Sequence, residues 1–203
     1  MYSLGTLDLF KQMTEQMKRN SDIEEKTSIL YVTNFHEDEA PNLKKIVIAV
    51  HGFNSSKEST VITALLPLLK ERNIGLLAFD LPSHGDNNKH LSIDNCIDDI
   101  RTVEGHLRGF NRSISFFSSS FGAYLTLLHL MDNTERYDEV VLRVPVIDPC
   151  KAFGHIRRRG VAVDDELYFQ MRENDVLENT GKIKEMINVI YATEDEIVDK
   201  MIS

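Results

Sequence analysis

Hydrophobic residues along the chain form two alternating patterns. Short continuous apolar runs, such as IVIAV at 46–50, have the character of strands buried on both faces of a sheet. Between these runs, apolar residues recur every three or four positions, as on the buried side of an amphipathic helix. The runs predict strands at residues 27–33, 44–53, 74–82, 113–117, 139–147 and 187–195, and the spaced patterns predict helices at 4–19, 58–72, 92–107 and 120–132.

Strands that alternate with helices predict an α/β fold, doubly wound, with a mostly parallel sheet covered on both faces. The length of 203 residues fits a single domain over 1–203. Within this domain we expect residues 1–26 to form an N-terminal helical extension. The polar stretch near 150–178 has no clear periodicity, and we expect it to form an irregular small cap.

The composition narrows the class of protein. Hydrophobic residues make up 42% and charged residues 27% of the chain, as in an ordinary soluble domain. The net charge of −9 argues against nucleic acid or an anionic membrane as partner. Without an export signal or an apolar run of about 18 residues, a cytoplasmic location is expected. Cys96 and Cys150 lack the spacing of a disulfide framework or a metal site, and we expect neither metal nor cofactor.

Three consecutive serines stand between a predicted strand and a predicted helix, in ISFFSSSFGAY at 114–124. A nucleophilic serine on such a sharp turn needs small residues two positions before and two positions after it. Ser118 and Ser119 each have a phenylalanine two residues earlier, whereas Ser120 is flanked by Ser118 and Gly122. The resulting S-x-S-x-G pattern is weak alone, because a serine before a helix is more often an N-cap.

The surrounding motifs favour a chemical role. IVIAVHGFN is a strand ending in His-Gly, and FDLPSHGDN follows the next strand. NVIYATEDEIVD resembles the acid-bearing motif G-x-x-D-x-x-V, with Ala192 in place of the glycine and with Asp195 and Val198 matching. In this order the motifs resemble those of the α/β-hydrolase superfamily, and the resemblance covers roughly residues 27–199. It implies a serine esterase or another acyl hydrolase.

The resemblance implies a role for several residues. Ser120 corresponds to the nucleophile, and the backbone N–H groups of Phe53 and Phe121 correspond to the oxyanion hole. Asp195 corresponds to the acid that orients the catalytic histidine. Glu194 is a weaker alternative for this acid.

Asp148, at the end of the preceding strand, is a further alternative for the acid, because some family members place it there. The position of the catalytic histidine is a gap in the resemblance. The family order is serine, acid, histidine, but no histidine follows Asp195, and the last one is His155. The chain could be part of a complete hydrolase, which we favour, or a natural inactive form, or His155 could substitute. His51 and His84 are expected to pack the strand ends.

These observations predict a serine hydrolase that cleaves an ester, thioester or related acyl bond of a small molecule. The soluble, acidic character favours a carboxylesterase or thioesterase over a membrane-active lipase, and a peptidase stays open. The alternative is a truncated or inactive relative that binds an acyl ligand or a partner. The apolar strand at 188–193 is expected to form an exposed sheet edge, through which the chain could form a homo-oligomer.

Overall fold

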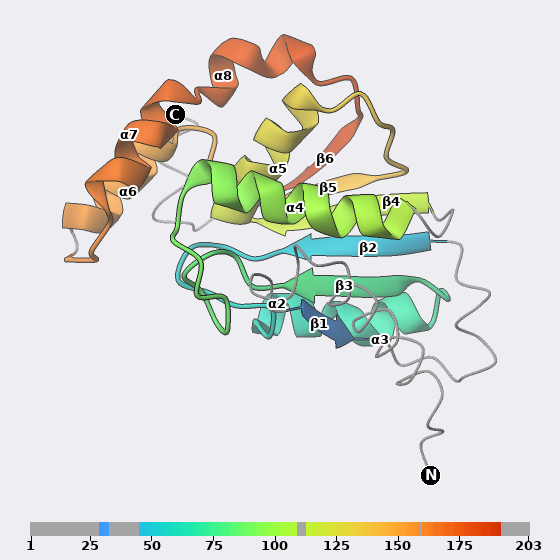
Figure 1. The fold of residues 1–203 in the computed structure, drawn as a ribbon. Coiled ribbons are helices and arrows are strands. Elements are labelled where there is room, and N and C mark those ends of the chain that lie inside the picture. The colour runs from blue at the N-terminus through green and yellow to red at the C-terminus, as the bar shows by residue number, and fades with distance from the viewer. Residues whose placement is uncertain (1–28, 33–44, 109–112, 159, 192–203) are drawn as a thin grey trace.

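A computed structural model describes residues 29–32, 45–108, 113–158 and 160–191 (Figure 1). Its centre is one six-stranded sheet with the order β1-β3-β2-β4-β5-β6. β1 pairs antiparallel with β3, and all the other neighbours are parallel. The strands are β1 (Ile29–Val32), β2 (Lys45–Val50), β3 (Gly75–Phe79), β4 (Ser113–Ser119), β5 (Val140–Arg143) and β6 (Ile187–Ile190).

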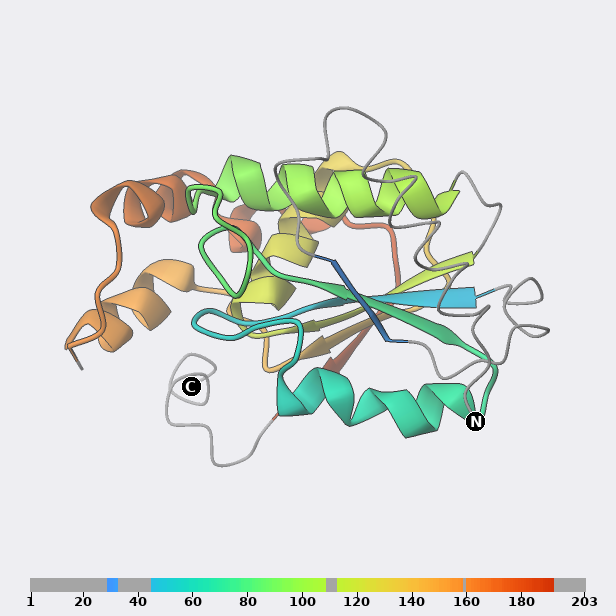
Figure 2. The ribbon, with the colours of Figure 1, turned by 60° about the horizontal axis from the view of Figure 1, so that its bottom comes forward.

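Helices lie on both faces of the sheet, as Figures 1 and 2 show. α4 and α5 cover one face, and α2 and α3 lie against the other, while α6 and α7 lie beyond the carboxyl ends of the strands. The helices are α2 (Thr60–Thr63), α3 (Leu65–Lys70), α4 (Ile93–Arg108), α5 (Phe121–Asp132), α6 (Pro149–Arg158), α7 (Asp165–Glu173) and α8 (Val176–Asn179), followed by the 3-10 turn η2 (Thr180–Lys182). The predicted doubly wound, mostly parallel sheet is confirmed.

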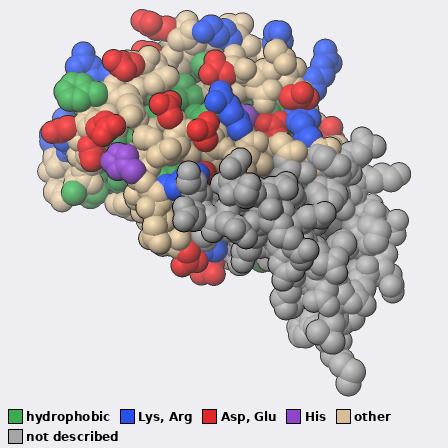
Figure 3. Space-filling view, in the orientation of Figure 1, with side chains coloured by type: hydrophobic (Ala, Val, Ile, Leu, Met, Phe, Trp, Pro, Cys, Tyr) green, Lys and Arg blue, Asp and Glu red, His purple; other side chains and the backbone are tan. Residues whose placement is uncertain are grey.

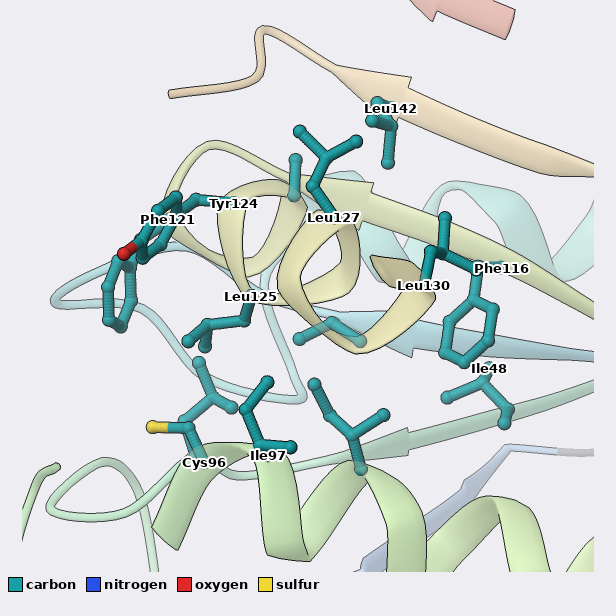
Figure 4. Packing of buried hydrophobic residues seen from close by; sticks show 14 of the residues in the cluster. Ile48, Cys96, Ile97, Phe116, Phe121, Tyr124, Leu125, Leu127, Leu130 and Leu142 are labelled. Carbon is teal, nitrogen blue, oxygen red and sulfur yellow. The ribbon is translucent and has the colours of Figure 1, made fainter. Parts of the chain in front are cut away.

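The core has a larger and a smaller part, because successive residues of a strand point to opposite faces. In β2, Ile48 packs on the side of α4 and α5, and Val47 packs with Ile62 of α2. Figure 4 shows the larger part, where side chains of α5 meet those of α4 and of the central strands. β3 is buried throughout and β2 is buried from Ile46 to Val50, which explains why these two strands appear in the sequence as continuous apolar runs.

Three predicted elements differ in extent from the expectation. The helix predicted at 58–72 is divided into α2 and α3 at Ala64, because Pro67 lacks the N–H that would continue the hydrogen bonds of α2. The strand predicted at 139–147 ends at Arg143, because Val144 takes a positive φ of 48°. The strand predicted at 187–195 is observed over Ile187–Ile190.

The expectation that 150–178 is irregular is wrong, since this stretch is mostly helical in α6, α7 and α8. Its helices are short, so that none of them shows a long run of apolar residues at helical spacing. Pro149 opens α6, a position that suits proline, and the Asp164 side chain caps α7 by accepting the N–H of Glu166. The predicted N-terminal helix at 4–19 lies outside the described residues. The single-domain interpretation stays a prediction.

The surface of the described residues is polar on the face in Figure 3, where acidic and basic side chains are interspersed. The edge strand β6 differs, because Ile190 is 48% and Val189 40% exposed. Within the described part of the chain, no helix has the length and apolar character needed to cross a membrane.

Candidate active site

Ser120 occupies the turn between β4 and α5 with φ 53° and ψ −117°. A positive φ is strained for a residue with a side chain, and surrounding contacts must hold it. The N–H of Ser120 donates to the carbonyl of Arg143 at 3.0 Å, and its own carbonyl accepts the N–H of Val146 at 3.4 Å. The neighbouring strand β5 and the segment after it therefore fix the backbone of this serine at the carboxyl edge of the sheet.

Two glycines allow the elements around Ser120 to approach one another. A Cβ on Gly122 would lie 2.3 Å from the carbonyl oxygen of His51 and 2.5 Å from that of Val50. A Cβ on Gly52 would lie 3.2 Å from the Cβ of Ser120. The start of α5 and the loop after β2 can thus lie against each other at this serine only because these side chains are absent.

The residue two positions before Ser120 is also small and enclosed. Ser118 is fully buried, and its hydroxyl lies 2.7 Å from the hydroxyl of Thr126 in α5. A bulkier side chain here would collide with the helix that must pass beside it. The steric rule that selected Ser120 from its neighbours is therefore consistent with the packing on both sides of the turn.

Phe53 and Phe121 lie close together at this edge of the sheet. Their ring centroids are 6.0 Å apart, and Phe153 of α6 packs edge-on against both, at 4.9 Å and 5.4 Å. Within the described residues, neither the Phe53 nor the Phe121 backbone N–H has a hydrogen-bond partner. The arrangement thus leaves two backbone donors unpaired, one beside Ser120 in sequence and one on the loop that contacts it.

His51 is buried, and both of its ring nitrogens are hydrogen-bonded to backbone groups. Its Nδ1 lies 2.8 Å from the carbonyl oxygen of Gly52 and must donate to it, so Nε2 is left to accept the N–H of Leu81 at 3.0 Å. Burial lowers the pKa of His51 to about 4, which keeps the ring neutral. As expected, this histidine packs a strand end.

His84 is the other strand-end histidine and is likewise buried and occupied by backbone groups. Its Nδ1 lies 2.8 Å from the carbonyl oxygen of Pro82, and its Nε2 accepts the N–H of Asn54 at 3.0 Å. The expectation that it packs a strand end is confirmed as well.

Of the three candidates for the catalytic acid, only Asp148 lies within the described residues. Asp195 and Glu194 lie outside the described residues, so their roles stay predictions. Asp148 accepts the N–H of Lys151 at 2.8 Å, which makes its carboxylate a cap for the first turn of α6.

No side chain of the described residues is hydrogen-bonded to the Ser120 hydroxyl. His155 lies half-buried in α6, the helix that also carries Phe153. Its Nε2 is enclosed and has no hydrogen-bond partner among the described residues.

A buried ionic cluster joins the loops after β2 and β3. The Lys57 amine donates to Asp80 at 2.5 Å and to Asp86 at 2.7 Å, and the Lys57 backbone N–H donates to Asp80 at 2.8 Å. Burial alone would lower the pKa of Lys57, but these hydrogen bonds outweigh it and raise the pKa. Burial likewise opposes the charge on Asp80, yet the hydrogen bonds from Lys57 and Asp86 hold its pKa below the usual range.

This cluster was not predicted from the sequence, although one residue pointed to it. Asp80 directly follows the apolar run of β3, where an acidic residue at a buried position requires a partner. The partner, Lys57, lies 23 residues away in the chain.

A comparison with protein families agrees with this architecture. The family model described as "Alpha/beta hydrolase family" matches residues 47–188. The chain belongs to the alpha/beta hydrolase family. The match contains β2 from Val47 onward, the turn at Ser120 and β5, which are the elements around the candidate site.

Solved structures of alpha/beta hydrolases share the fold at low sequence identity. Est1E from Butyrivibrio proteoclasticus, solved with ferulic acid bound, has a TM-score of 0.68 and 16% identity, over 87% of this chain and 79% of that one. The esterase Pf2001 of Pyrococcus furiosus has a TM-score of 0.64 and 21% identity, over 87% and 74%. A monoacylglycerol lipase of Paleococcus ferrophilus has a TM-score of 0.63 and 17% identity, over 85% and 79%. A search of curated proteins gives no significant match.

Proposed function

We propose that this alpha/beta hydrolase is a serine hydrolase that cleaves an ester, thioester or related acyl bond of a small molecule. The single observation that carries the proposal is the conformation of Ser120, a strained serine between a strand and a helix with small residues two positions before and two positions after it. This conformation supports the assignment of a nucleophile elbow, a turn that exposes its hydroxyl at the top of the sheet. An ordinary N-cap serine needs no positive φ.

In the proposed reaction, the Ser120 oxygen attacks the carbonyl carbon of the acyl group while its proton passes to a base. The charge that develops on the carbonyl oxygen is stabilised by the unpaired N–H groups of Phe53 and Phe121. The intermediate then collapses, and the alcohol or thiol leaves with the proton. Water repeats the attack on the acyl-enzyme and releases the acid. None of these steps asks for a metal or a cofactor.

The base in this proposal is a histidine oriented by Asp195. Among the described residues, His155 is the candidate for this base. His155 has one property that a base requires, an enclosed ring nitrogen with no other partner among the described residues.

The similar structures support an acyl substrate. Pf2001 is named an esterase, Est1E was solved with ferulic acid, and another neighbour is a monoacylglycerol lipase. Their TM-scores of 0.63–0.68 show a shared fold, and at identities of 16–21% they show no more than that, so the ester or thioester substrate is carried to this chain only as part of the proposal.

The second candidate is an inactive relative that binds an acyl ligand or a partner. The observation in its favour is that the described residues provide no side chain hydrogen-bonded to the Ser120 hydroxyl. A nucleophile without a base would keep the shape of the site and lose its reactivity.

Intact mass after treatment with a fluorophosphonate probe separates the candidates. The purified chain, Ser120→Ala and the neighbouring control Ser119→Ala are treated alike. The proposal expects one adduct on the chain and on the Ser119 variant, and none on the Ser120 variant. Absence of any adduct on the unmodified chain would overturn it in favour of the binding protein. An adduct that persists in Ser120→Ala would show that another residue is the nucleophile.

A further inference from the structure

Two loops at the carboxyl edge of the sheet are joined so that each determines the shape of the other. The oxyanion loop (residues 51–57, after β2) carries Phe53, and the partner loop (residues 80–87, after β3) carries His84. The Lys57–Asp80 pair links the end of the first loop to the start of the second. Closer to Ser120, each loop supplies one imidazole that accepts a backbone N–H from the other loop.

The hydrogen bonds of His84 specify the state of its ring. The carbonyl of Pro82, 2.8 Å from Nδ1, can only accept, so Nδ1 carries the proton. The Asn54 N–H, 3.0 Å from Nε2, can only donate, so Nε2 carries none. His84 is 7% exposed, so water is a poor substitute for either partner. Both bonds form together only when the ring is neutral and protonated at Nδ1.

These contacts fix the two peptide planes on either side of Phe53. In a trans peptide the C=O and N–H point in opposite directions, so holding one of them orients the other. His51 holds the carbonyl of Gly52, which shares a plane with the N–H of Phe53. His84 holds the N–H of Asn54, which shares the next plane with the carbonyl of Phe53. Asn54 also has a positive φ of 53°, a conformation that needs support from its surroundings.

We propose that His84 is a positioning residue: its neutral imidazole holds the Asn54 N–H and thereby the peptide plane of the Phe53 carbonyl, and together with His51, which holds the plane before it, keeps the Phe53 N–H directed toward the oxyanion. This role rests on the proposed acyl-transfer function. His84 does not touch the substrate, and it acts through the backbone of the oxyanion loop. The Phe53 ring, 5.7 Å from the imidazole, adds a packing contact to the same link.

The role depends on protonation. A proton on Nε2 would turn an acceptor into a donor facing another donor, and the link to Asn54 would be lost. The titratable groups around the two imidazoles are the rings themselves, with centroids 5.2 Å apart, and Asp80, Lys57 and Asp86. Against the effect of burial, hydrogen bonds from Lys57 and Asp86 hold the pKa of Asp80 below its usual range, so the proton that would break the link is one on the imidazole, not one on Asp80.

The test compares His84→Phe with His84→Gln, and uses His90→Phe as the matched control. Phenylalanine keeps a ring without an acceptor, whereas the glutamine carbonyl oxygen can take the place of Nε2. His90 is an exposed histidine of the same region, with a side chain 58% exposed. The readouts are the rate and the half-saturation concentration of fluorophosphonate labelling, and hydrogen exchange of the Asn54 amide.

We expect His84→Phe to lower the maximal labelling rate about 10- to 100-fold, as for a misplaced oxyanion donor, with little change in half-saturation. His84→Gln should recover most of the rate, and His90→Phe should match the unmodified chain. In the unmodified chain, the protection factor of the Asn54 amide should fall with pH in step with the titration of His84 followed by NMR. This last measurement needs no variant and remains decisive if His84→Phe fails to fold.

A His84→Phe chain that labels at the original rate would overturn the inference and leave the proposed function intact. An Asn54 amide whose protection ignores the His84 titration would do the same. An unmodified chain that never labels would instead remove the proposed function, and this positioning role with it.

Discussion

Adding one methyl group at Gly122 tests the close approach between α5 and β2. The new Cβ would lie 2.3 Å and 2.5 Å from two carbonyl oxygens and 2.8 Å from a carbonyl carbon, all of them backbone atoms of Val50 and His51. Ordinary contact begins at 3.4 Å. Because no rotamer change can relieve a clash between backbone and Cβ, α5 or β2 must move by about 1 Å in a packed core.

Overpacking of this kind costs about 1–3 kcal/mol or more, and a backbone clash belongs at the upper end. Against this, alanine in place of glycine in a helix raises the free energy of unfolding by up to about 1 kcal/mol, because alanine has the higher helix propensity. We therefore expect Gly122→Ala to lower the free energy of unfolding by about 2 kcal/mol, which corresponds to a Tm lower by about 4–8 °C in a chain of this size.

Urea denaturation of Gly122→Ala and Gly105→Ala measures the cost of the clash and the gain in helix propensity separately. Gly105 lies in α4, and a Cβ there would meet nothing within 4 Å, so its alanine variant should gain about 0.5–1 kcal/mol from helix propensity. A Gly122→Ala chain as stable as the unmodified one would refute the view that this contact fixes the serine turn.

Other predictions concern the serine, the buried histidine and the sheet edge. Ser120→Gly should raise the free energy of unfolding by about 1 kcal/mol in urea denaturation, because glycine relieves the positive φ, and it should abolish labelling; an unchanged or lower stability would argue against strain. The pKa of His51 is lowered from 6.5 to about 4. The folded state therefore has its full stability with respect to this group above pH 6.5, and it loses about 3 kcal/mol of unfolding free energy as the pH falls toward 4. His51→Gln should remove that part of the acid dependence of urea midpoints, and an identical pH profile in the variant would contradict it. At the β6 edge, we propose self-association of the chain; sedimentation should show a mass that rises with concentration and that Ile190→Lys lowers, whereas a monomer at all concentrations would exclude it.

The turn at Ser120 could be predicted because its requirements are local. The choice among three serines rests on residues two positions away, and the structure has Ser118 buried and Gly122 in close contact as that choice requires. The sheet was predictable for a similar reason, since strands buried on both faces leave continuous apolar runs.

Other features depend on contacts between distant segments and leave no local pattern. Lys57 and Asp80 are 23 residues apart, and neither position by itself indicates a buried ion pair. The end of β5 is another example. The sequence continues with apolar residues after Arg143, but Val144 turns out of the strand, where its N–H bonds to the carbonyl of Ile190. The end of β5 at Arg143 therefore depends on where β6 lies, which the local sequence does not indicate.

The order of the strands has a consequence for the synthesis of this protein. The central strands β2, β3 and β4 all lie within residues 45–119, so they can pair before the rest of the chain is made. The acceptor of the Ser120 N–H is the carbonyl of Arg143, which is translated later. We therefore expect the middle of the sheet to form on the ribosome while the serine is still free to relax, and its strained backbone to be set only when β5 emerges. Stalled nascent chains ending before and after β5 would show this, and protection of the Ser120 amide in the shorter chain would contradict it.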